Sequence, residues 1–420
     1  MGVVAASYLL VFPYFPSLNN PNENVRFYMT AALVQDGTYR IDGPWELWGW
    51  VNDSARTDDG RRYSVKAPGT SLLALPAFAA YNALPGELDR KVALWVCRVG
   101  GAALPSLMFL AWLYGWLARR VPERPGLVDA AFLSLALGSN YYAYSLLFVS
   151  HSLAAACGFG AFMLIHDKRR PGLAGLLTAS VTLFEYPGIV VSVVLTAWAL
   201  TTYPRKHWPR FIALALVPTA AVMHFHWSAF GNPLTPGHRW LENPAYRKLA
   251  RQGLYGASSA PQPEALLGLT LNPGYGLLPL TPLLAAALLP PYRRVRGVWV
   301  ALAIPLLLLV AISCMNNWRG GWTVGPRYLT PILPFVVWRA LEGLSRMPAR
   351  PARLFALSAL AIALVLSGLL SAWYPHVPPK IEFPLTEQLW PMLKAGELPW
   401  LPPALLGGAW LIAYRRSSNS

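Results

Sequence analysis

The chain has 420 residues, of which 55% are apolar and 13% are charged, and its mean hydropathy is +0.37. Soluble domains carry roughly 25% charged residues, so this composition excludes an ordinary soluble protein and indicates a polytopic membrane protein. The formal net charge of +16 comes from short Lys and Arg clusters between apolar runs. That distribution favours anionic headgroups and cytoplasmic anchoring over nucleic acid as the reason for the charge.

The first apolar run, residues 2–17, is shorter than the roughly 20 residues that cross a bilayer. It has no cationic leader and no small-residue cleavage pattern, so we expect a first transmembrane helix whose beginning is missing rather than a cleaved signal peptide. The three cysteines lie within or at the end of apolar runs without paired spacing. They therefore indicate neither a disulfide framework nor a thiolate metal site.

Further apolar runs follow along the whole chain and predict a single all-α integral membrane domain over residues 1–420, with about twelve crossings. No internal repeat and no second soluble domain is visible. The runs cover residues 68–86, 92–118, 127–147, 149–166, 172–202, 211–230, 276–291, 297–315, 327–341, 353–373 and 400–414.

Basic loops predict the orientation of these crossings, because cytoplasmic loops are enriched in Lys and Arg. In the C-terminal half the connections 231–275, 316–326 and 374–399 are then outside, opposite the basic loops with Arg293, Arg294, Arg296, Arg346, Arg350, Arg353, Arg415 and Arg416. Residues 18–69 are also outside if 172–202 is one long helix kinked at Pro187. We expect that arrangement. It places six cations on the outside, which is contrary to the charge bias: Arg119, Arg120, Arg124, Lys168, Arg169 and Arg170.

Residues 18–69 form the first outer loop and are the most charged part of the chain. Seven of the 19 acidic residues lie here, together with six cations. Such a loop provides both a base and a cradle for an anion, which is what a reaction centre needs. The charged residues are Glu23, Asp36, Asp42, Glu46, Asp53, Asp58, Asp59, Arg26, Arg40, Arg56, Arg61, Arg62 and Lys66.

The loop begins with a helix pattern. Asn20 and Pro21 predict an N-cap followed by proline at the first helical position, an apolar stripe follows, and Gly37 can end the helix. We expect this helix to lie on the membrane surface, at the depth where a lipid-linked substrate presents its phosphate. Glu23 has capping-box spacing from Asn20, which suits a structural role and does not exclude a catalytic one.

The second part of the loop, residues 52–69, reads as a turn-rich entry to the next membrane helix. Asp58 and Asp59 precede Gly60 and fit turn chemistry as well as catalysis. Lys66 lies beside the predicted helix on the outer side, where cations are depleted. It is therefore either an interfacial anchor or a ligand for a phosphate.

The chain resembles the GT-C superfamily of glycosyltransferases that use polyprenyl-phosphate sugars, which includes aminoarabinose transferases and protein O-mannosyltransferases. The resemblance covers most of the chain and is closest to a bacterial branch. Its motifs stand here as NENVR at 22–26, GTYRID at 37–42, TDD at 57–59, YSVKAPG at 63–69, GNP at 231–233, GGW at 320–322 and GPRYL at 325–329.

This resemblance implies transfer of a sugar from a polyprenyl-phosphate donor to an acceptor hydroxyl outside the membrane, with inversion. It implies Glu23 as the base, with Asp58 and Asp59 as further catalytic candidates. Val65 stands where an acid is expected, which leaves the choice of carboxylate and the presence of a divalent metal open. Lys66, Arg26, Arg327 and, in the second long outer loop (231–275), Arg239 are the implied phosphate ligands, and the implied sugar- or lipid-lining residues are Tyr63, Trp318 and Trp322.

Polar residues within apolar runs give weaker signals. Glu185 is expected to face the bundle interior. His224 and His226 point to different faces of a helix, which disfavours a shared metal site, and we expect both, like His151, to be structural.

The resemblance implies a bacterial cytoplasmic membrane, with an acceptor glycan, lipid or protein, and membrane lipids, as partners. A transporter or flippase of lipid-linked sugars is the alternative, but the paired inverted repeats of many transporters are not visible. A non-catalytic scaffold would not need so many carboxylates in one outer loop.

Overall fold

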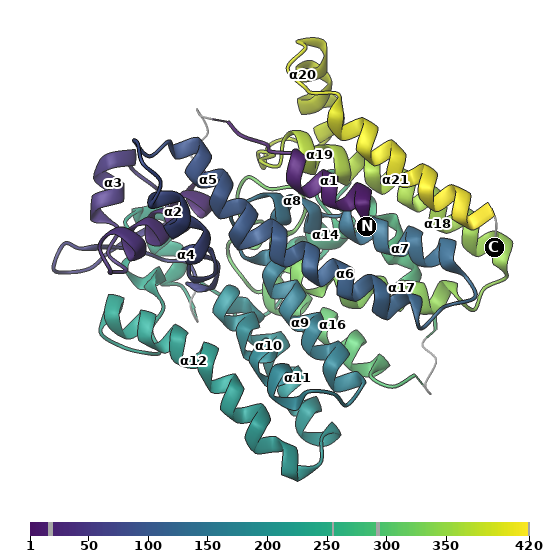
Figure 1. Cartoon of the computed structure of the whole chain (residues 1–420), viewed down its shortest axis with the longest axis horizontal. Coiled ribbons are helices and arrows are strands. Elements are labelled where there is room, and N and C mark those ends of the chain that lie inside the picture. The colour runs from purple at the N-terminus through teal and green to yellow at the C-terminus, as the bar shows by residue number, and fades with distance from the viewer. Residues whose placement is uncertain (16–19, 254–255, 291–294, 419–420) are drawn as a thin grey trace.

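The computed structural model describes residues 1–15, 20–253, 256–290 and 295–418. Within these residues the chain is mostly helical, with one small two-stranded sheet, which confirms the predicted helical class. Figure 1 shows a layer of long helices with shorter helices gathered at one end. Arg293, Arg294 and the first residues of the 18–69 loop lie outside the described residues.

Helix α2 (Pro21–Gln35) starts and ends as predicted. The Asn20 side chain accepts a hydrogen bond from the Glu23 N–H at 3.4 Å, and Gly37 follows the helix with a φ of +64°. Every residue from Asn22 to Ala32 is buried in the protein, and the position of the helix at the level of the membrane surface stays a prediction. The helix is enclosed by its neighbours within the protein.

The rest of the first loop packs around α2. It contains the short helix α3 (Asp42–Trp48) and an antiparallel hairpin of β1 (Ser54–Arg56) and β2 (Arg62–Ser64). Asp58, Asp59 and Gly60 form its turn as predicted, with Gly60 at a φ of +83° that favours glycine. The two strands were not predicted.

Helix α4 (Gly69–Asn82) lies along α2. The Ser71 hydroxyl donates to the Arg26 carbonyl at 2.9 Å, and the Gln35 amide donates to Asn82 at 2.9 Å, so the two helices stay together over most of their length. The segment predicted as the second crossing therefore belongs to the assembly formed by the first loop.

The bundle that follows runs back and forth between two ends. The end beside α2 is called the cavity end here, and the opposite one the basic end. The segments from residue 90 to residue 230 are α5 (Arg90–Arg98), which continues through η1 (Val99–Ala103) into α6 (Leu104–Ala118), then α7 (Pro125–Ala136), α8 (Asn140–Leu146), α9 (His151–His166), α10 (Pro171–Phe184), α11 (Ile189–Thr202) and α12 (Trp208–Phe230).

The expected single helix over 172–202 is wrong, because α10 and α11 form a hairpin. The Ser192 hydroxyl of α11 donates to the Thr178 carbonyl of α10 at 2.7 Å, and Tyr203 donates to the Arg169 carbonyl at 2.9 Å. The 3₁₀ turn η2 (Tyr186–Gly188), which contains a proline, reverses the chain between the two helices. A continuous helix would separate Thr178 from Ser192 by about 21 Å, so these contacts require the reversal.

Compared with the predicted topology, the α10 and α11 hairpin adds one pass along the bundle, and α4, which stays beside α2, removes one. The two changes cancel, so the chain still returns to the cavity end at residue 230. Phe230 packs edge-on against Tyr63 of β2, with ring centroids 5.8 Å apart. The first loop and the second long loop, 231–275, consequently meet at one end. In this arrangement the basic connections lie at the opposite end, as the enrichment of Lys and Arg in cytoplasmic loops predicts.

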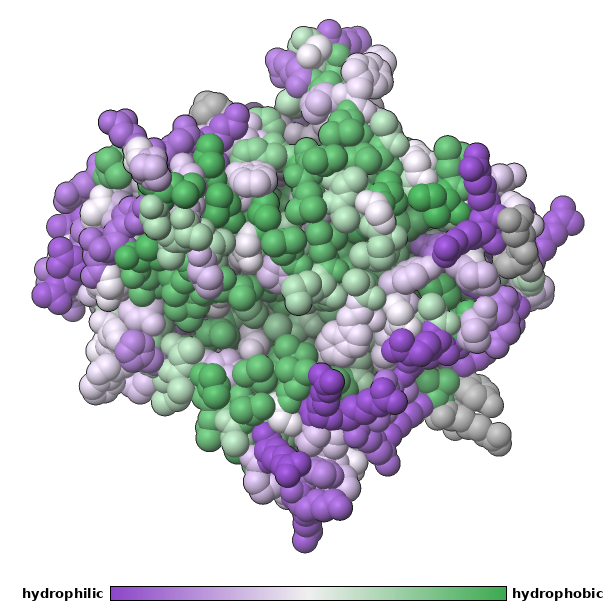
Figure 2. Space-filling model, viewed as in Figure 1, coloured by the Kyte–Doolittle hydropathy of each residue, from purple (hydrophilic) through white to green (hydrophobic). Residues whose placement is uncertain are grey.

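The basic loops share the other end. Arg120 pairs with Asp167 at 2.5 Å, and Arg124 donates to the Met347 carbonyl at 2.8 Å. Arg416 pairs with Asp129, near the start of α7, at 3.3 Å. The expectation that Arg120 and its neighbours lie on the side of the first loop is therefore wrong. Figure 2 shows the resulting surface, a broad hydrophobic band with hydrophilic groups toward both ends.

The remaining helices complete the bundle and the cavity end. They are η4 (Gly237–Trp240), α13 (Pro244–Ala250), α14 (Pro263–Leu271), α15 (Leu277–Leu280), η5 (Pro282–Leu288), α16 (Val298–Ser313), η6 (Arg327–Ile332), α17 (Leu333–Leu344), α18 (Ala349–Ala363), η7 (Leu364–Gly368), α19 (Leu369–Trp373), η8 (Leu385–Leu389), α20 (Trp390–Lys394) and α21 (Leu401–Ser418), together with α1 (Gly2–Leu10) and η3 (Arg205–His207).

Among the residues that the structure describes, three continuous helical segments are long and apolar enough to cross a membrane, and a fourth results if the bent pair α8 and α9 is one span. The three are 90–118, 205–230 and 349–373. Four shorter apolar helices accompany them, including α7 and α10. The count of about twelve crossings stays a prediction.

Candidate functional site

A cavity of about 490 Å³ opens at the cavity end of the bundle. Every connection predicted to lie outside contributes to its wall, although these connections are far apart in sequence. The lining residues are Asn20, Pro21, Asn22, Trp50, Asn52, Asp53, Val65, Lys66, His238, Leu241, Tyr246, Leu249, Ala250, Gly256, Met315, Asn316, Asn317, Gly320, Gly321, Trp322, Arg327, Tyr328 and His376.

An ion pair between Asp53 and Lys66 forms one wall. The hairpin register pairs Ser54 with Ser64 and brings the Val65 N–H to the Asp53 carbonyl at 3.2 Å. Lys66 Nζ then lies 3.0 Å from Asp53 Oδ2, and both side chains are partly open to the cavity. Two residues that are 13 positions apart are thus joined by strand pairing.

The pair leaves Asp53 ionised at neutral pH. Burial raises the pKa of the Asp53 carboxyl, but Lys66 and then Arg327 outweigh that effect and leave the pKa below its usual value. Asp53 is the one carboxylate among the described lining residues. It is available to accept a proton from a group that enters the cavity.

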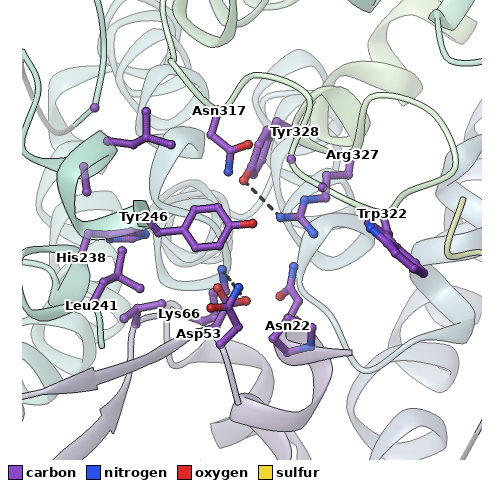
Figure 3. Close-up of a pocket in the computed structure, with 18 of the residues that line it drawn as sticks. Asn22, Asp53, Lys66, His238, Leu241, Tyr246, Asn317, Trp322, Arg327 and Tyr328 are labelled. Atoms are coloured by element: carbon purple, nitrogen blue, oxygen red, sulfur yellow. Dashed lines mark hydrogen bonds and ion pairs between the residues drawn. The ribbon is translucent and has the colours of Figure 1, made fainter. Parts of the chain in front are cut away.

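Arg327 projects into the cavity from the opposite side, at the start of η6. Its Nη2 donates to the Tyr328 hydroxyl at 3.2 Å, which orients the guanidinium. Gly320 passes close behind with a φ of +74°, and a Cβ there would lie 2.8 Å from Arg327 Nε. Figure 3 shows Arg327 facing the Asp53 and Lys66 pair across the cavity, with Asn22 between them.

The predicted base, Glu23, is not in the lining. Arg98 binds both carboxylate oxygens, at 2.5 and 2.8 Å, and the Phe148 N–H donates to Oε1 at 2.7 Å. Burial raises the pKa of Glu23, but Arg98 outweighs it and the net pKa is lowered. These contacts describe a buried structural ion pair, and the catalytic role of Glu23 stays a prediction.

Arg26 lies beneath the cavity rather than in its lining. Its guanidinium donates to the Asn22 carbonyl at 2.8 Å, to the Asn22 side chain, and to the Ser150 hydroxyl at 2.8 Å. Ser150 in turn donates to Glu185 at 2.6 Å, so Glu185 faces the bundle interior as expected. Burial lowers the pKa of Arg26 to about 10, and it remains charged at neutral pH. Arg26 thereby orients Asn22, which does line the cavity.

Of the other predicted site residues, some line the cavity and others are exposed or packed away from it. Trp322 joins Lys66 and Arg327 in the lining, at the exposed rim. Asp58 and Asp59 are exposed at the hairpin turn, and Arg239 is exposed beside Trp240. Two aromatic residues are packed elsewhere, against Phe230 and Tyr275 respectively: Tyr63 and Trp318.

Two histidines, His238 and His376, also line the cavity. Burial lowers the pKa of His238 to about 4, with Lys66 adding to the effect. Burial also lowers the pKa of His376 to about 4, against the opposing charge of Glu23. Both imidazoles are therefore neutral at physiological pH, and a neutral imidazole can donate one hydrogen bond and accept another.

The lining offers a poor set of metal ligands. In the parts of the chain that the structure describes, no three His, Cys, Asp or Glu side chains are grouped to hold a metal ion. The lining carboxylate of Asp53 is already paired with Lys66. The charge-stabilising groups that remain are the cations Lys66 and Arg327.

Asp53 was missed because the sequence was interpreted as a loop. Asn52-Asp53-Ser54 and Ser64-Val65-Lys66 flank the predicted Asp58-Asp59-Gly60 turn symmetrically. A hairpin centred on that turn would have placed Asp53 beside Lys66. His376 gives no such signal, because its position depends on packing between distant segments.

The fold is similar to that of ArnT from Cupriavidus metallidurans. Its crystal structures in the apo state and bound to undecaprenyl phosphate give TM-scores of 0.56 and 0.53, each at 15% sequence identity. The alignments cover 99% of this chain and 73% and 74% of the ArnT chains. The helical fold expected from the sequence thus has a solved counterpart in ArnT.

By sequence alone the chain matches no protein-family model and no curated protein. The likeness to ArnT at 15% identity therefore concerns the fold.

Proposed function

We propose that the chain is a membrane glycosyltransferase that moves a sugar from a polyprenyl-phosphate donor to an acceptor hydroxyl. The observation that carries this proposal is the cavity in which the Asp53 and Lys66 pair faces Arg327. An acid–base group and two cations converge there on a space large enough for a sugar phosphate. The ArnT fold, solved with undecaprenyl phosphate bound, supports the same class of donor.

The orientation follows from the charge bias. The basic end carries Arg120, Arg124 and Arg346 with their neighbours and faces the cytoplasm, so the cavity end lies outside. This proposed arrangement keeps the expected count of about twelve crossings, with α10 and α11 counted separately and α4 excluded. The location is a bacterial cytoplasmic membrane.

The leaving group in such a transfer is a lipid phosphate, which departs as an anion. It needs positive charge as the bond to the anomeric carbon breaks, more than it needs a general acid. Lys66 and Arg327 provide that charge from two sides of the cavity. Asn22, held by Arg26, adds an amide to the same region.

Asp53 acts as the base for the acceptor hydroxyl. The hydroxyl loses its proton to Asp53 as its oxygen attacks the anomeric carbon, and the carbon–phosphate oxygen bond breaks on the opposite face with inversion. When Lys66 turns toward the phosphate, Asp53 loses its nearest cation and its pKa rises. The ion pair thus makes the strength of the base depend on the presence of donor.

The test measures cleavage of the sugar–phosphate bond. Membranes containing the chain and a labelled polyprenyl-phosphate sugar should release polyprenyl phosphate and transfer the label. Asp53→Asn should slow this by roughly a hundredfold to ten-thousandfold, the usual range for loss of a general base. Asp58→Asn, which makes the same change at the exposed turn, serves as the control and should leave the rate unchanged.

A transporter or flippase would give the opposite result. It would move the labelled lipid across the membrane without breaking the bond, and Asp53→Asn would leave the label attached as in the unaltered chain. Movement without cleavage in the presence of acceptor-containing membranes would overturn the proposal.

A further inference from the structure

Amide side chains dominate the polar part of the cavity. Five asparagines reach it from three separate segments of the chain, whereas the described lining contains three charged side chains, Asp53, Lys66 and Arg327. An amide both donates and accepts hydrogen bonds, which matches the hydroxyl groups of a sugar. The five are Asn20, Asn22, Asn52, Asn316 and Asn317.

Some of these amide atoms are already used by the protein. Asn20 caps α2, the Asn22 oxygen accepts from Arg26, and the Asn52 oxygen accepts from Asn243 at 2.6 Å. The Asn316 nitrogen donates to Gln252 at 3.3 Å. The Asn20 amide uses both of its ends, because its nitrogen also donates to Glu23 Oε2 at 3.3 Å. Within the described residues, the nitrogens of Asn22 and Asn52 and the oxygen of Asn316 are left for a ligand.

Asn317 is the freest of the set. Its side chain has no hydrogen-bond partner within the part of the chain that the structure describes. In Figure 3 Asn317 and Asn22 enter the cavity from opposite sides, with the Tyr246 hydroxyl pointing between them. Trp50 and Trp322, each 51% exposed, add aromatic faces to the lining.

The charges in the cavity balance once the donor's phosphate is present. The described lining has two cations and one carboxylate, and its two histidines are neutral at pH 7 because their pKa values are about 4. A polyprenyl-phosphate sugar carries one negative charge on its phosphodiester. The charged groups beneath the cavity also compensate one another, as Arg98 binds Glu23 and Arg26 shares Ser150 with Glu185.

We propose that the sugar of the donor is uncharged and is held through its hydroxyl groups by the asparagines of the cavity, Asn22 and Asn317 in particular. This inference rests on the proposed function. A sugar bearing an ammonium group would enter a site with two cations, Lys66 and Arg327, and one carboxylate, Asp53, which the acceptor hydroxyl needs as its base. A uronic acid would add a further negative charge to the cavity. The positive charges of Lys66 and Arg327 are already neutralised by the Asp53 carboxylate and the donor phosphate. Either charge would lack a partner in a partly desolvated cavity, which is unfavourable.

The experiment compares three matched probes on one lipid, farnesyl-phosphate glucose, its 4-amino-4-deoxy analogue and its glucuronic acid analogue. Farnesyl phosphate alone is the fourth probe and reports the phosphate site without a sugar. Binding to the purified full chain is measured by displacement of a fluorescent farnesyl phosphate. The glucose probe should bind on the order of tenfold more tightly than either charged analogue, a difference typical of one partly screened charge.

Asn317→Asp then places a carboxylate in the cavity. It should strengthen binding of the amino analogue and weaken binding of the glucuronic acid analogue, each by roughly tenfold. The matched control is Asn232→Asp, which makes the same change at an exposed residue outside the lining. The control should leave the order of the four probes unchanged.

The outcomes separate the two proposals. Tighter binding of either charged analogue than of glucose, while farnesyl phosphate binds, overturns the uncharged sugar and leaves the proposed function standing. An unchanged order of probes in Asn317→Asp overturns the assignment of Asn317. Binding of none of the four probes overturns the proposed function together with the inference.

Discussion

Two ion pairs at the cavity end have the same chemistry and different surroundings. Glu23 and Arg98 are only 3% and 4% exposed, and the Phe148 N–H and Asn20 side chain also contact the carboxylate. Asp53 and Lys66 are 19% and 16% exposed and line the cavity. The enclosed pair holds α2 against α5, whereas the open pair can exchange its partners with a ligand. Access to a cavity, rather than charge itself, separates a structural carboxylate from a candidate base.

The largest effect should come from breaking the enclosed pair. Arg98→Met leaves Glu23 buried without its cation, which typically costs about 3–5 kcal/mol in free energy of unfolding. The thermal midpoint of the purified chain measures this. Arg61→Met, which breaks the exposed pair with Asp59, is the control and should leave the midpoint almost unchanged. Equal loss in both variants would contradict the distinction between enclosed and exposed pairs.

Breaking the open pair should instead affect the reaction. Lys66→Ala removes a cation from the phosphate, and loss of one such stabilising group slows turnover by roughly a hundredfold. The rate of polyprenyl phosphate release measures this effect. Lys206→Ala at the exposed basic end is the matched control and should retain full activity. An unchanged rate in Lys66→Ala would make Lys66 an interfacial anchor.

His376 lines the same cavity as the open pair, and its pKa is affected by the charges of the enclosed pair, Glu23 and Arg98. Its pKa is about 4 in the folded chain and about 6.5 when unfolded. Between these values the unfolded chain binds more protons, so the free energy of unfolding falls as pH drops through this window.

The slope from His376 alone is about 1 kcal/mol per pH unit. Thermal midpoints from pH 7 to pH 4 measure it, and His376→Gln should make the decline shallower. An equally steep decline in that variant would show that His376 is not the group responsible.

The smallest effect is expected at the hairpin turn. Asp59→Asn removes a charge that lies 3.3 Å from Arg61 at a site more than half exposed. Surface changes of this kind usually leave stability almost unchanged. Both the midpoint and the turnover rate should stay close to those of the unaltered chain. A large fall in turnover would return Asp59 to the list of catalytic candidates.

The sequence was informative wherever the signal is local. Asn20 and Pro21 start α2, Gly60 ends the turn, and the loops predicted to be outside do meet at one end of the bundle. The charge bias was also correct in the middle third. The interpretation of 172–202 as a single helix contradicted that bias. The hydrogen bond between Ser192 and Thr178 shows a hairpin instead, which agrees with the charge bias.

What the sequence could not provide depends on distant partners. Nothing near Glu23 indicates that Arg98, 75 residues away, occupies both of its oxygens. Lys66 and Arg327 were found through motifs, because the residue types and their neighbours are distinctive. Asp53 required the register of a hairpin, and the five asparagines of the cavity are recognisable as a set only in three dimensions.

The most direct test measures two properties of two variants, Asp53→Asn and Glu23→Gln, side by side. Thermal midpoint reports folding, and polyprenyl phosphate release per folded molecule reports the chemistry. Asp53→Asn should keep its midpoint and lose turnover by a hundredfold or more, roughly the contribution of a general base. Glu23→Gln should lose stability while its folded fraction remains active. A folded, inactive Glu23→Gln beside an active Asp53→Asn would contradict the account and make Glu23 the base.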